Sequence, residues 1–383
     1  MLQTDGGVQM TKQEADKPYL HWMYQAVGMG NRKLFRELRQ LGPAREIYEI
    51  AKKGLLEEKL SAKYKKKAEK LTASTQNYNV TAKYEEMAGR GISFVTDDEE
   101  GYPAKLAAVP DAPCAIYYVG KMPDDRAESI AVIGARECSE YGRSLAKQFG
   151  RMLAEAGIQV VSGMARGIDG IGQQAALDAG GYSMGVLGCG VDICYPLEHR
   201  GLYDQLIEKG GICSEYPPGI EPRATLFPPR NRIISGLCDA VLVIEAKERS
   251  GTLITVDMAL EQGREVYALP GRVSDPLSRG CNRLIRQGAE IVISPQELLQ
   301  ELKPGFAGKE TYEQQTIFPS DSTKGRLMRI LDFQPRSMEL LQRIYADTYG
   351  GHIAIPELCH ELLQLCAAGC AGQVGGNYYV RKM

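Results

Sequence analysis

One pattern repeats between residues 130 and 292: a short apolar strand, a glycine-rich turn and then a helix. In the helix expected at 142–156, for example, Phe149 and Leu153 lie on one apolar face. Strands that alternate with helices of this length predict a parallel, doubly wound sheet with right-handed crossovers. The fold class expected here is therefore α/β, with an extended Rossmann-like sheet. The expected strands are residues 130–133, 158–161, 183–187, 211–214, 240–245, 265–269 and 290–293.

The turns that follow these strands carry glycine, and each of the three turns given below also carries an arginine. A turn that opens a helix leaves backbone N–H groups unpaired at the positive end of the helix dipole, so it receives anions, above all phosphates. Turns of one parallel sheet gather along its carboxyl edge. The sequence therefore predicts a ligand with several phosphates at this edge. The turns are Gly134-Ala135-Arg136, the run from Ser162 to Asp169, and Arg249-Ser250-Gly251-Thr252.

Two smaller regions flank the segment 91–302, which we assign to the Rossmann-like domain. Residues 18–90 have apolar residues at helical spacing and predict an all-helical domain that resembles SAM or helix-hairpin-helix domains. Residues 327–383 predict two helices and a hairpin, the outline of a winged-helix domain. A polar tail at 1–17, expected to be disordered, and an aperiodic linker at 303–326 complete the expected layout.

Individual elements of the flanking regions can also be predicted. Residues 91–120 are extended and rich in proline, which favours one or two extra strands at the edge of the sheet. Gly28-Met29-Gly30 resembles the turn of a helix-hairpin-helix, whose glycines let backbone N–H groups approach a phosphate, but two ordinary helix caps explain the same residues. The expected helices are residues 19–27, 33–41, 44–53, 55–71, 337–349 and 355–368, and the expected hairpin is 369–380.

The composition gives no sign of a cofactor, a metal site or a membrane span. The ten cysteines have no Cys-x-x-Cys spacing and there are only four histidines, which favours free thiols in a reducing cytoplasm. No apolar stretch is long enough to cross a bilayer. The net charge of −2 means that any binding of nucleic acid must come from a local patch. We expect a cytoplasmic protein without a bound metal or cofactor.

Two common nucleotide sites do not fit the sequence. A dinucleotide site needs Gly-x-Gly-x-x-Gly after the first strand and an acidic residue about 20 residues later. Here Arg136 replaces the second glycine of that motif, and the second strand is followed by Ser162 rather than by a carboxylate. The phosphate loop Gly-x-x-x-x-Gly-Lys-Ser/Thr does not occur in the sequence. NAD binding and ATP hydrolysis are therefore not expected.

A third kind of nucleotide site, found in a class of enzymes, resembles this sequence more closely. Lysine-decarboxylase-like phosphoribohydrolases carry Pro-Gly-Gly-x-Gly-Thr-x-x-Glu, in which the glutamate does the chemistry at the glycosidic bond. In the matching segment, which starts at Ser250, Thr255 stands at the place of that glutamate. A hydroxyl cannot act as a general base near neutral pH without an activating partner. An enzyme would have to use Glu215 or Asp169 instead, and we assign no catalytic residue.

Binding of a single strand is the function that the remaining residues favour. Arginines neutralise the phosphate charges of a strand, and aromatic rings stack on its unpaired bases. Two structural alternatives stay open: Arg232 and Asn231 could hold their own loop through buried carbonyls, and Tyr195 could pack on the core. The arginines expected at the sheet edge are Arg136, Arg166, Arg230, Arg232 and Arg249, and the interleaved rings are Tyr141, Tyr195 and Phe227.

Residues 102–298 resemble the bacterial DNA-processing protein A family, also called DprA or Smf. The most specific motif is Phe-Pro-Pro-Arg-Asn-Arg-Ile-Ile-Ser-Gly-Leu from Phe227 to Leu237. The other motifs are Val132-Ile133-Gly134-Ala135-Arg136, Ser162-Gly163-Met164-Ala165-Arg166-Gly167-Ile168-Asp169, Val186-Leu187-Gly188-Cys189-Gly190-Val191-Asp192, Ser214-Glu215-Tyr216-Pro217-Pro218-Gly219 and Ser250-Gly251-Thr252-Leu253-Ile254-Thr255.

The resemblance implies a non-enzymatic protein of natural transformation and recombination. Such a protein binds incoming single-stranded DNA, protects it and loads the RecA recombinase onto it, and it works as a homodimer. By motif, Arg136 and the turn from Ser162 to Asp169 would hold phosphates, and Phe227 to Arg232 would lie along the strand. The expected site comprises Gly134, Arg136, Ser139, Ser162, Gly163, Arg166, Gly167, Arg223, Phe227, Arg230, Asn231, Arg232, Gly251 and Thr252.

The chain departs from the family pattern at three positions. Leu197 stands where some members have a lysine, His199 stands where the family usually has an asparagine, and Ala224 replaces a lysine with Arg223 adjacent. Contacts from these positions are the least transferable part of the resemblance. A phosphoribohydrolase-like enzyme and a protein-interaction scaffold are the alternative functions.

Overall fold

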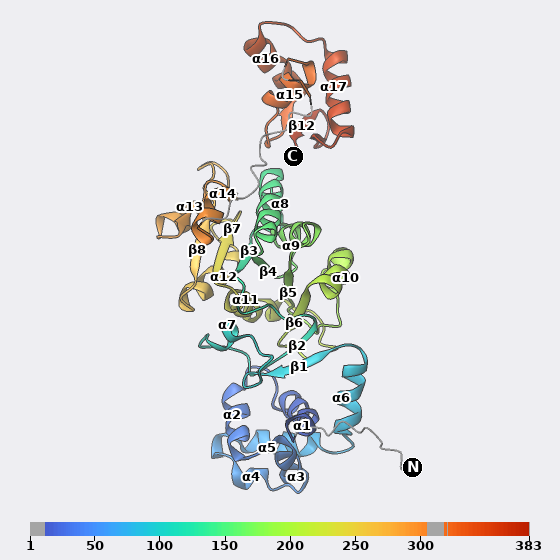
Figure 1. The fold of residues 1–383 in the computed structure, drawn as a ribbon, viewed down its shortest axis with the longest axis vertical. Helices are drawn as coiled ribbons and strands as arrows, with labels where there is room; N and C mark the ends of the chain where they lie inside the picture. The colour runs from blue at the N-terminus through green and yellow to red at the C-terminus, as the bar shows by residue number, and fades with distance from the viewer. Residues whose placement is uncertain (1–11, 305–317, 320, 383) are drawn as a thin grey trace, which may run out of the picture. The chain divides into compact units, whose positions relative to one another are not determined.

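The structure, a computed structural model, describes residues 12–304, 318–319 and 321–382. Most of the expected N-terminal tail and of the expected linker therefore lies outside the described residues. The chain divides into two compact units, Met1–Asp125 with Met184–Leu237 and Arg126–Ser183 with Cys238–Met383. The expected domain at 91–302 contributes strands to both units (Figure 1), and each unit is described by itself.

The central strands form a nine-stranded, mostly parallel sheet, so the expected α/β class is confirmed. In the first unit the order is β1-β2-β6-β5, with antiparallel pairs except for β5 and β6. In the second unit the order is β4-β3-β7-β8-β9 and every pair is parallel. The strands are β1 (Ser93–Thr96), β2 (Ala115–Gly120), β3 (Ser129–Ile133), β4 (Gln159–Ser162), β5 (Ser183–Val186), β6 (Gly211–Ser214), β7 (Ala240–Val243), β8 (Glu265–Ala268) and β9 (Glu290–Ile291).

The expected strands from β3 to β9 are all present, with ends that differ by one or two residues, and the proline-rich segment supplies β1 and β2. Helices separate the parallel strands because their apolar faces cover the sheet. The elements between the strands are α7 (Ala104–Ala107), α8 (Glu140–Glu155), α9 (Ile168–Asp178), η2 (Leu197–His199), α10 (Arg200–Lys209), η3 (Ala224–Leu226), α11 (Phe227–Gly236), α12 (Gly251–Glu261) and α13 (Arg279–Arg286), and α14 (Pro295–Leu302) follows β9.

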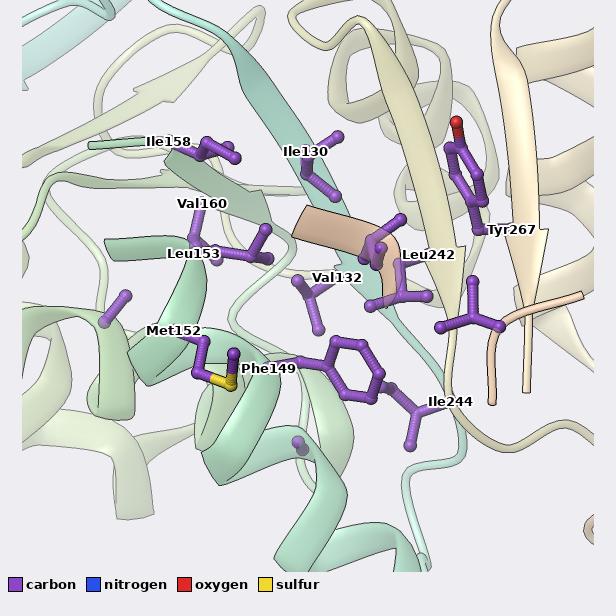
Figure 2. Close-up of a cluster of buried hydrophobic side chains, with 14 of the residues drawn as sticks. Ile130, Val132, Phe149, Met152, Leu153, Ile158, Val160, Leu242, Ile244 and Tyr267 are labelled. Atoms are coloured by element: carbon purple, nitrogen blue, oxygen red, sulfur yellow. The ribbon is translucent and has the colours of Figure 1, made fainter. Parts of the chain in front are cut away.

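In the second unit, α8 and α9 lie side by side against β3 and β4 (Figure 1). Alternate residues of a strand point to one face of a sheet, so Ile130 and Val132 of β3 reach the same core. Figure 2 shows Phe149 of α8 directed toward Val132 and Ile244 in this core. Phe149 is 1 % exposed. The apolar pattern of the sequence therefore fixes the strand–helix layer on which the carboxyl-edge loops stand.

The N-terminal part of the first unit is helical, as expected, but α1 begins inside the segment expected to be a tail. The prediction of one helix over 55–71 is wrong, because the chain turns at Leu60 and Ser61. Leu60 has extended backbone, and the Ser61 N–H donates to Glu37 Oε1 at 3.0 Å. The helices are α1 (Lys12–Val27), α2 (Arg32–Leu41), α3 (Ala44–Lys52), α4 (Leu56–Lys59), η1 (Ala62–Tyr64), α5 (Lys65–Ser74) and α6 (Val80–Gly89).

The C-terminal part of the second unit has helices and a small antiparallel sheet in the order β10-β12-β11. The expected hairpin is confirmed as β11 and β12. An additional helix, α15, begins inside the segment expected to be a linker, and the Ser322 hydroxyl caps it by accepting the Gly325 N–H. The elements are α15 (Thr323–Ile330), β10 (Arg336–Ser337), α16 (Met338–Tyr349), α17 (Ile355–Ala367), β11 (Ala371–Gln373) and β12 (Tyr378–Arg381). Among the described residues, none of the helices combines the length and the apolar character that crossing a bilayer requires.

Aromatic rings join α1 to the first two strands of the first unit. His21 of α1 lies edge-on to Phe94 of β1 and Tyr117 of β2, with ring centroids 5.4 and 5.7 Å apart. Its Nε2 is 3.1 Å from Gln25 Nε2, and the side chain is almost completely buried. Burial disfavours the imidazolium and lowers the pKa of His21 to about 4.

This buried histidine makes the first unit sensitive to acid. In the unfolded chain a histidine has a pKa near 6.5, so the unfolded state takes up a proton between pH 6.5 and about 4 while the folded state does not. Stability is therefore lost as the pH falls through this window, by about 3 kcal/mol at pH 4 from this group. The free energy of unfolding of His21→Phe, measured with urea, should change less with pH than that of the wild type, and replacement of the exposed His352 with alanine provides the control variant. Equal slopes for His21→Phe and the wild type would contradict the assignment.

Candidate nucleic-acid interface

In the second unit, the loops after β3 and β4 pack directly against each other. The Ile168 N–H donates to the Ala135 carbonyl at 3.2 Å. Gly167 has a φ of 71°, and a Cβ at this position would collide with that same carbonyl oxygen. The Thr252 hydroxyl, in the first turn of α12, donates to the Gly134 carbonyl at 3.1 Å. The structure thus brings Gly134, Gly167 and Thr252 of the expected site together.

A buried carboxylate accepts hydrogen bonds at the N-terminus of α8. Glu245, just beyond β7, is 3 % exposed and accepts the Ser139 N–H at 2.9 Å and the Ser139 hydroxyl. Ser139 Oγ in turn accepts the Gly142 N–H at 3.0 Å, and a Cβ at Gly142 would collide with the Glu245 carboxylate. Burial raises the pKa of Glu245, and the hydrogen bonds from Ser139 oppose that rise. An internal anion therefore occupies the place where a helix N-terminus would hold a phosphate.

The N-terminus of α9 also has internal acceptors. Gly163 donates its N–H to Asp169 Oδ2 at 3.2 Å, and Met164 donates to Gln173 Oε1 at 3.0 Å. The Ser162 hydroxyl points into the sheet and donates to the Val132 carbonyl at 2.6 Å. Three groups that the sequence offered for phosphate binding, Ser139, Ser162 and the Gly163 amide, thus make hydrogen bonds inside this unit.

Other expected residues of this unit face outward. Arg136, on the loop after β3, and Arg166, on the loop after β4, are both exposed. Gly251 at the start of α12 is exposed too, and a Cβ there would meet no atom within 4 Å. In this unit, the groups that face a phosphate in solution are therefore the guanidinium groups of Arg136 and Arg166 and the first turn of α12.

In the first unit, the specific motif that begins at Phe227 forms the start of α11. Pro228 and Pro229 suit the first turn of a helix, where the missing N–H groups would have no helical partner. The Phe227 ring stacks on Tyr195 with centroids 5.4 Å apart and an interplanar angle of 30°. The Arg230 guanidinium carbon lies 5.9 Å from the centroid of the same ring.

Arg232 of α11 holds the first unit together. Its Nη2 donates to both oxygens of Glu215 at 2.8 Å, and its Nε and Nη1 donate to the Asp111 and Pro229 carbonyls at 2.9 Å. The Glu215 side chain is 7 % exposed. Of the two interpretations of Arg232, the geometry therefore favours the structural one.

The other expected residues near this motif differ in accessibility. Arg230 is 4 % exposed, Asn231 is partly exposed, and Arg223 is exposed at the N-terminus of η3. Arg223 is thus the outward-facing cation among the expected site residues of this unit.

The residues that an enzyme would need are held inside the protein. Thr255, at the place of the hydrolase glutamate, is buried in α12. Glu215 pairs with Arg232, and Asp169 accepts the Gly163 N–H. Among the residues that the structure describes, no group of three or more His, Cys, Asp or Glu side chains could hold a metal ion.

No local pattern in the sequence singles out Glu245. An acidic residue directly after an apolar strand is typical of the start of a solvated loop. The only signal that Glu245 could be buried is the hydrophobic run that precedes it. Tyr195, for which packing on the core is one of the open alternatives, is 43 % exposed and stacks on Phe227.

In the second unit, loops that carry glycine and arginine follow the carboxyl ends of parallel strands, an arrangement typical of α/β proteins. Residues 93–303 match the family described as DNA recombination-mediator protein A. The chain is 38 % identical over 293 residues to Protein Smf of Escherichia coli, which covers 74 % of this chain and 76 % of that protein. This chain belongs to the DNA recombination-mediator protein A family, also known as DprA/Smf.

A relative and a solved structure from Streptococcus pneumoniae agree with this assignment. The chain is 42 % identical over 205 residues to DNA processing protein DprA of Streptococcus pneumoniae, covering 54 % of this chain and 72 % of that protein. The X-ray structure of DprA from S. pneumoniae aligns with a TM-score of 0.63 and 31 % identity, covering 77 % of this chain and 99 % of the other. DNA processing protein A from Helicobacter pylori, solved for its single-stranded DNA binding mode, aligns over 55 % of this chain and 95 % of its own with 29 % identity and a TM-score of 0.49.

Replacing Glu245 tests its role at the N-terminus of α8. We expect Glu245→Ala to destabilise the second unit by about 2 kcal/mol, because the N–H and the hydroxyl of Ser139 lose the carboxyl group that accepts their hydrogen bonds. Exposed Glu248, whose carboxylate pairs with Arg283 at 3.5 Å, provides the control, and Glu248→Ala should cost about 0–1 kcal/mol. The measurement is urea unfolding of both variants. A Glu245→Ala variant as stable as the control would show that the carboxylate does not hold the loop.

Proposed function

We propose that this protein binds single-stranded DNA without catalysis, protects it and loads the RecA recombinase onto it during DNA uptake and recombination. The family is one of DNA recombination mediators, which supports an action on DNA intermediates. The finer roles, in natural transformation and RecA loading, follow from the family resemblance.

The observation that carries the proposal is the outward position of Arg136 and Arg166. Both are exposed on loops that pack against each other at the carboxyl ends of β3 and β4. Guanidinium groups bind phosphate oxygens through two parallel hydrogen bonds, and two of them on neighbouring loops can follow successive phosphates. Neither arginine belongs to a helix or strand that would read the bases of a duplex.

We propose two separate groups of DNA-contacting residues, one in each unit. In the second unit these are Gly134, Arg136, Arg166, Gly167, Gly251 and Thr252, supported inside by Ser139, Ser162 and Gly163. In the first unit they are Arg223, Phe227, Arg230 and Asn231, with Arg232 as the anchor of α11.

We infer a homodimer as the working form. The edge strand β9 has β8 as its neighbour in the sheet and leaves Ile291 45 % exposed, and Ile293, two residues later, is 71 % exposed. An apolar sheet edge is a ready surface for pairing with another chain. A second copy of this chain is the occupant we propose for it.

The proposal also includes the finer description of the fold. We interpret the sheet as doubly wound and Rossmann-like over 91–302, the helices of 18–90 as a SAM or helix-hairpin-helix-like domain, and 327–383 as a winged helix. Three helices and a three-stranded antiparallel sheet support the last interpretation. The cytoplasm is the compartment in which we expect this activity.

The first test is a titration with labelled single-stranded and duplex oligonucleotides at two salt concentrations. We expect single strands to bind much more tightly and with little dependence on sequence. If about six phosphates are neutralised, affinity should fall roughly a thousandfold between about 50 and 200 mM salt. Equal affinity for a matched duplex would contradict the proposal.

The second test addresses the alternative enzyme. We expect no release of free base from AMP or another nucleoside monophosphate above background, because Thr255 replaces the catalytic glutamate and is itself buried. Clear turnover that is abolished by Glu215→Gln or Asp169→Asn would instead support the phosphoribohydrolase. If the protein binds neither DNA nor nucleotides, the protein-interaction scaffold is the alternative function that remains.

A further inference from the structure

An exposed aromatic ring stands in the loop between β5 and η2 of the first unit. Tyr195 is 43 % exposed although its ring stacks on that of Phe227. Leu197, two residues later, is 79 % exposed, so this stretch of the loop presents apolar surface to solvent. Such surface is costly in water unless a partner covers it.

The ring beneath Tyr195 is confined from other directions. A Cβ at Gly188 would lie 2.7 Å from Phe227 Cδ1, so Phe227 lies directly on the backbone of the loop after β5. The Arg230 guanidinium, itself 4 % exposed, lies 5.9 Å from the Phe227 centroid. Phe227 is partly buried between these groups and Tyr195, and Tyr195 is the more exposed of the two rings.

A stacked pair with one exposed member suits a flat ligand. Bases of a single strand stack on aromatic side chains irrespective of their identity, because every base has a π-face. The inner ring fixes the plane of the outer one, so little side-chain entropy is lost when a base arrives. The cation beside Phe227 adds positive potential next to the platform.

We propose that Tyr195 receives a base of single-stranded DNA and that Phe227 is the support beneath it. This inference rests on the proposed function and deepens it, because it assigns base stacking to a residue outside the specific Phe227–Leu237 motif. Phe227 then acts as a positioning residue for Tyr195.

Binding of two oligonucleotides separates this role from a general effect on DNA binding. One is oligothymidylate, and the other is an abasic oligonucleotide of the same length, which has the phosphates but no bases. Tyr195→Ala should weaken oligothymidylate binding about tenfold or more while leaving abasic binding within about twofold. Tyr195→Phe should retain wild-type affinity for both, and Tyr195→Leu, which keeps apolar bulk without a flat ring, should behave like Tyr195→Ala.

Tyr378→Ala is the matched control, because Tyr378 of β12 is 50 % exposed and is not stacked on another ring in the described part of the chain. It should bind both oligonucleotides as the wild type does. Photocrosslinking of the wild-type protein to an iodouracil-substituted oligonucleotide gives a readout that needs no variant. Mass spectrometry should find the adduct on Tyr195.

The outcomes distinguish this inference from the function on which it rests. If the wild type fails to bind oligothymidylate, the proposed function fails. If the wild type binds but Tyr195→Ala loses affinity equally for both oligonucleotides, or Tyr378→Ala loses as much, the stacking role of Tyr195 is overturned. Adducts on residues other than Tyr195 would overturn it as well.

Discussion

The carboxylate of Glu245 is the constraint on which the loops of the second unit depend. It is buried at the end of β7 and accepts both the N–H and the hydroxyl of Ser139, so it ties the loop after β3 to the neighbouring strand. Desolvation of a carboxylate is costly, and here hydrogen bonds and the positive end of α8 offset that cost. The result is a fixed loop whose helix N-terminus is already occupied by an anion. We therefore propose that a phosphate is bound by side chains that extend beyond the loop, Arg136 among them.

In the first unit, a different pair of side chains, Glu215 and Arg232, has a comparable structural role. Glu215, just after β6, receives two hydrogen bonds from Arg232 of α11, and Arg232 also bonds two carbonyls. A buried ion pair with satisfied hydrogen bonds fixes position more than it adds stability. It sets the start of α11, and with it Phe227, against the loop that carries Tyr195. In each unit, an inward-facing pair of charged or polar groups fixes the position of the outward-facing groups that we propose to contact DNA.

Much of the fold could be predicted from the sequence because short apolar runs between glycine-rich turns have few alternatives to parallel strands. Leu60 and Ser61 show the limit of that approach, since the break in the predicted helix at 55–71 depends on a hydrogen bond to Glu37 of a different helix. The site was predicted by residue type but not by orientation. Ser139, Ser162 and Arg232 have the chemistry of phosphate ligands, yet tertiary partners that no local pattern reveals turn them inward. For Tyr195 the sequence leaves open whether the ring packs on the core, and only the structure shows that it stacks on Phe227 and is 43 % exposed.

The central claim is that the exposed Arg136 binds the strand, whereas Arg232, paired with Glu215, holds the fold. It is tested most directly by measuring single-strand affinity and melting temperature on Arg136→Ala and Arg232→Ala in parallel. The account predicts that Arg136→Ala loses about 1.5–3 kcal/mol of binding at an unchanged melting temperature. Arg232→Ala should lower the melting temperature, because it leaves Glu215 buried without its partner. A stable Arg232→Ala protein that has lost DNA binding, together with an Arg136→Ala protein that melts early, would contradict the account.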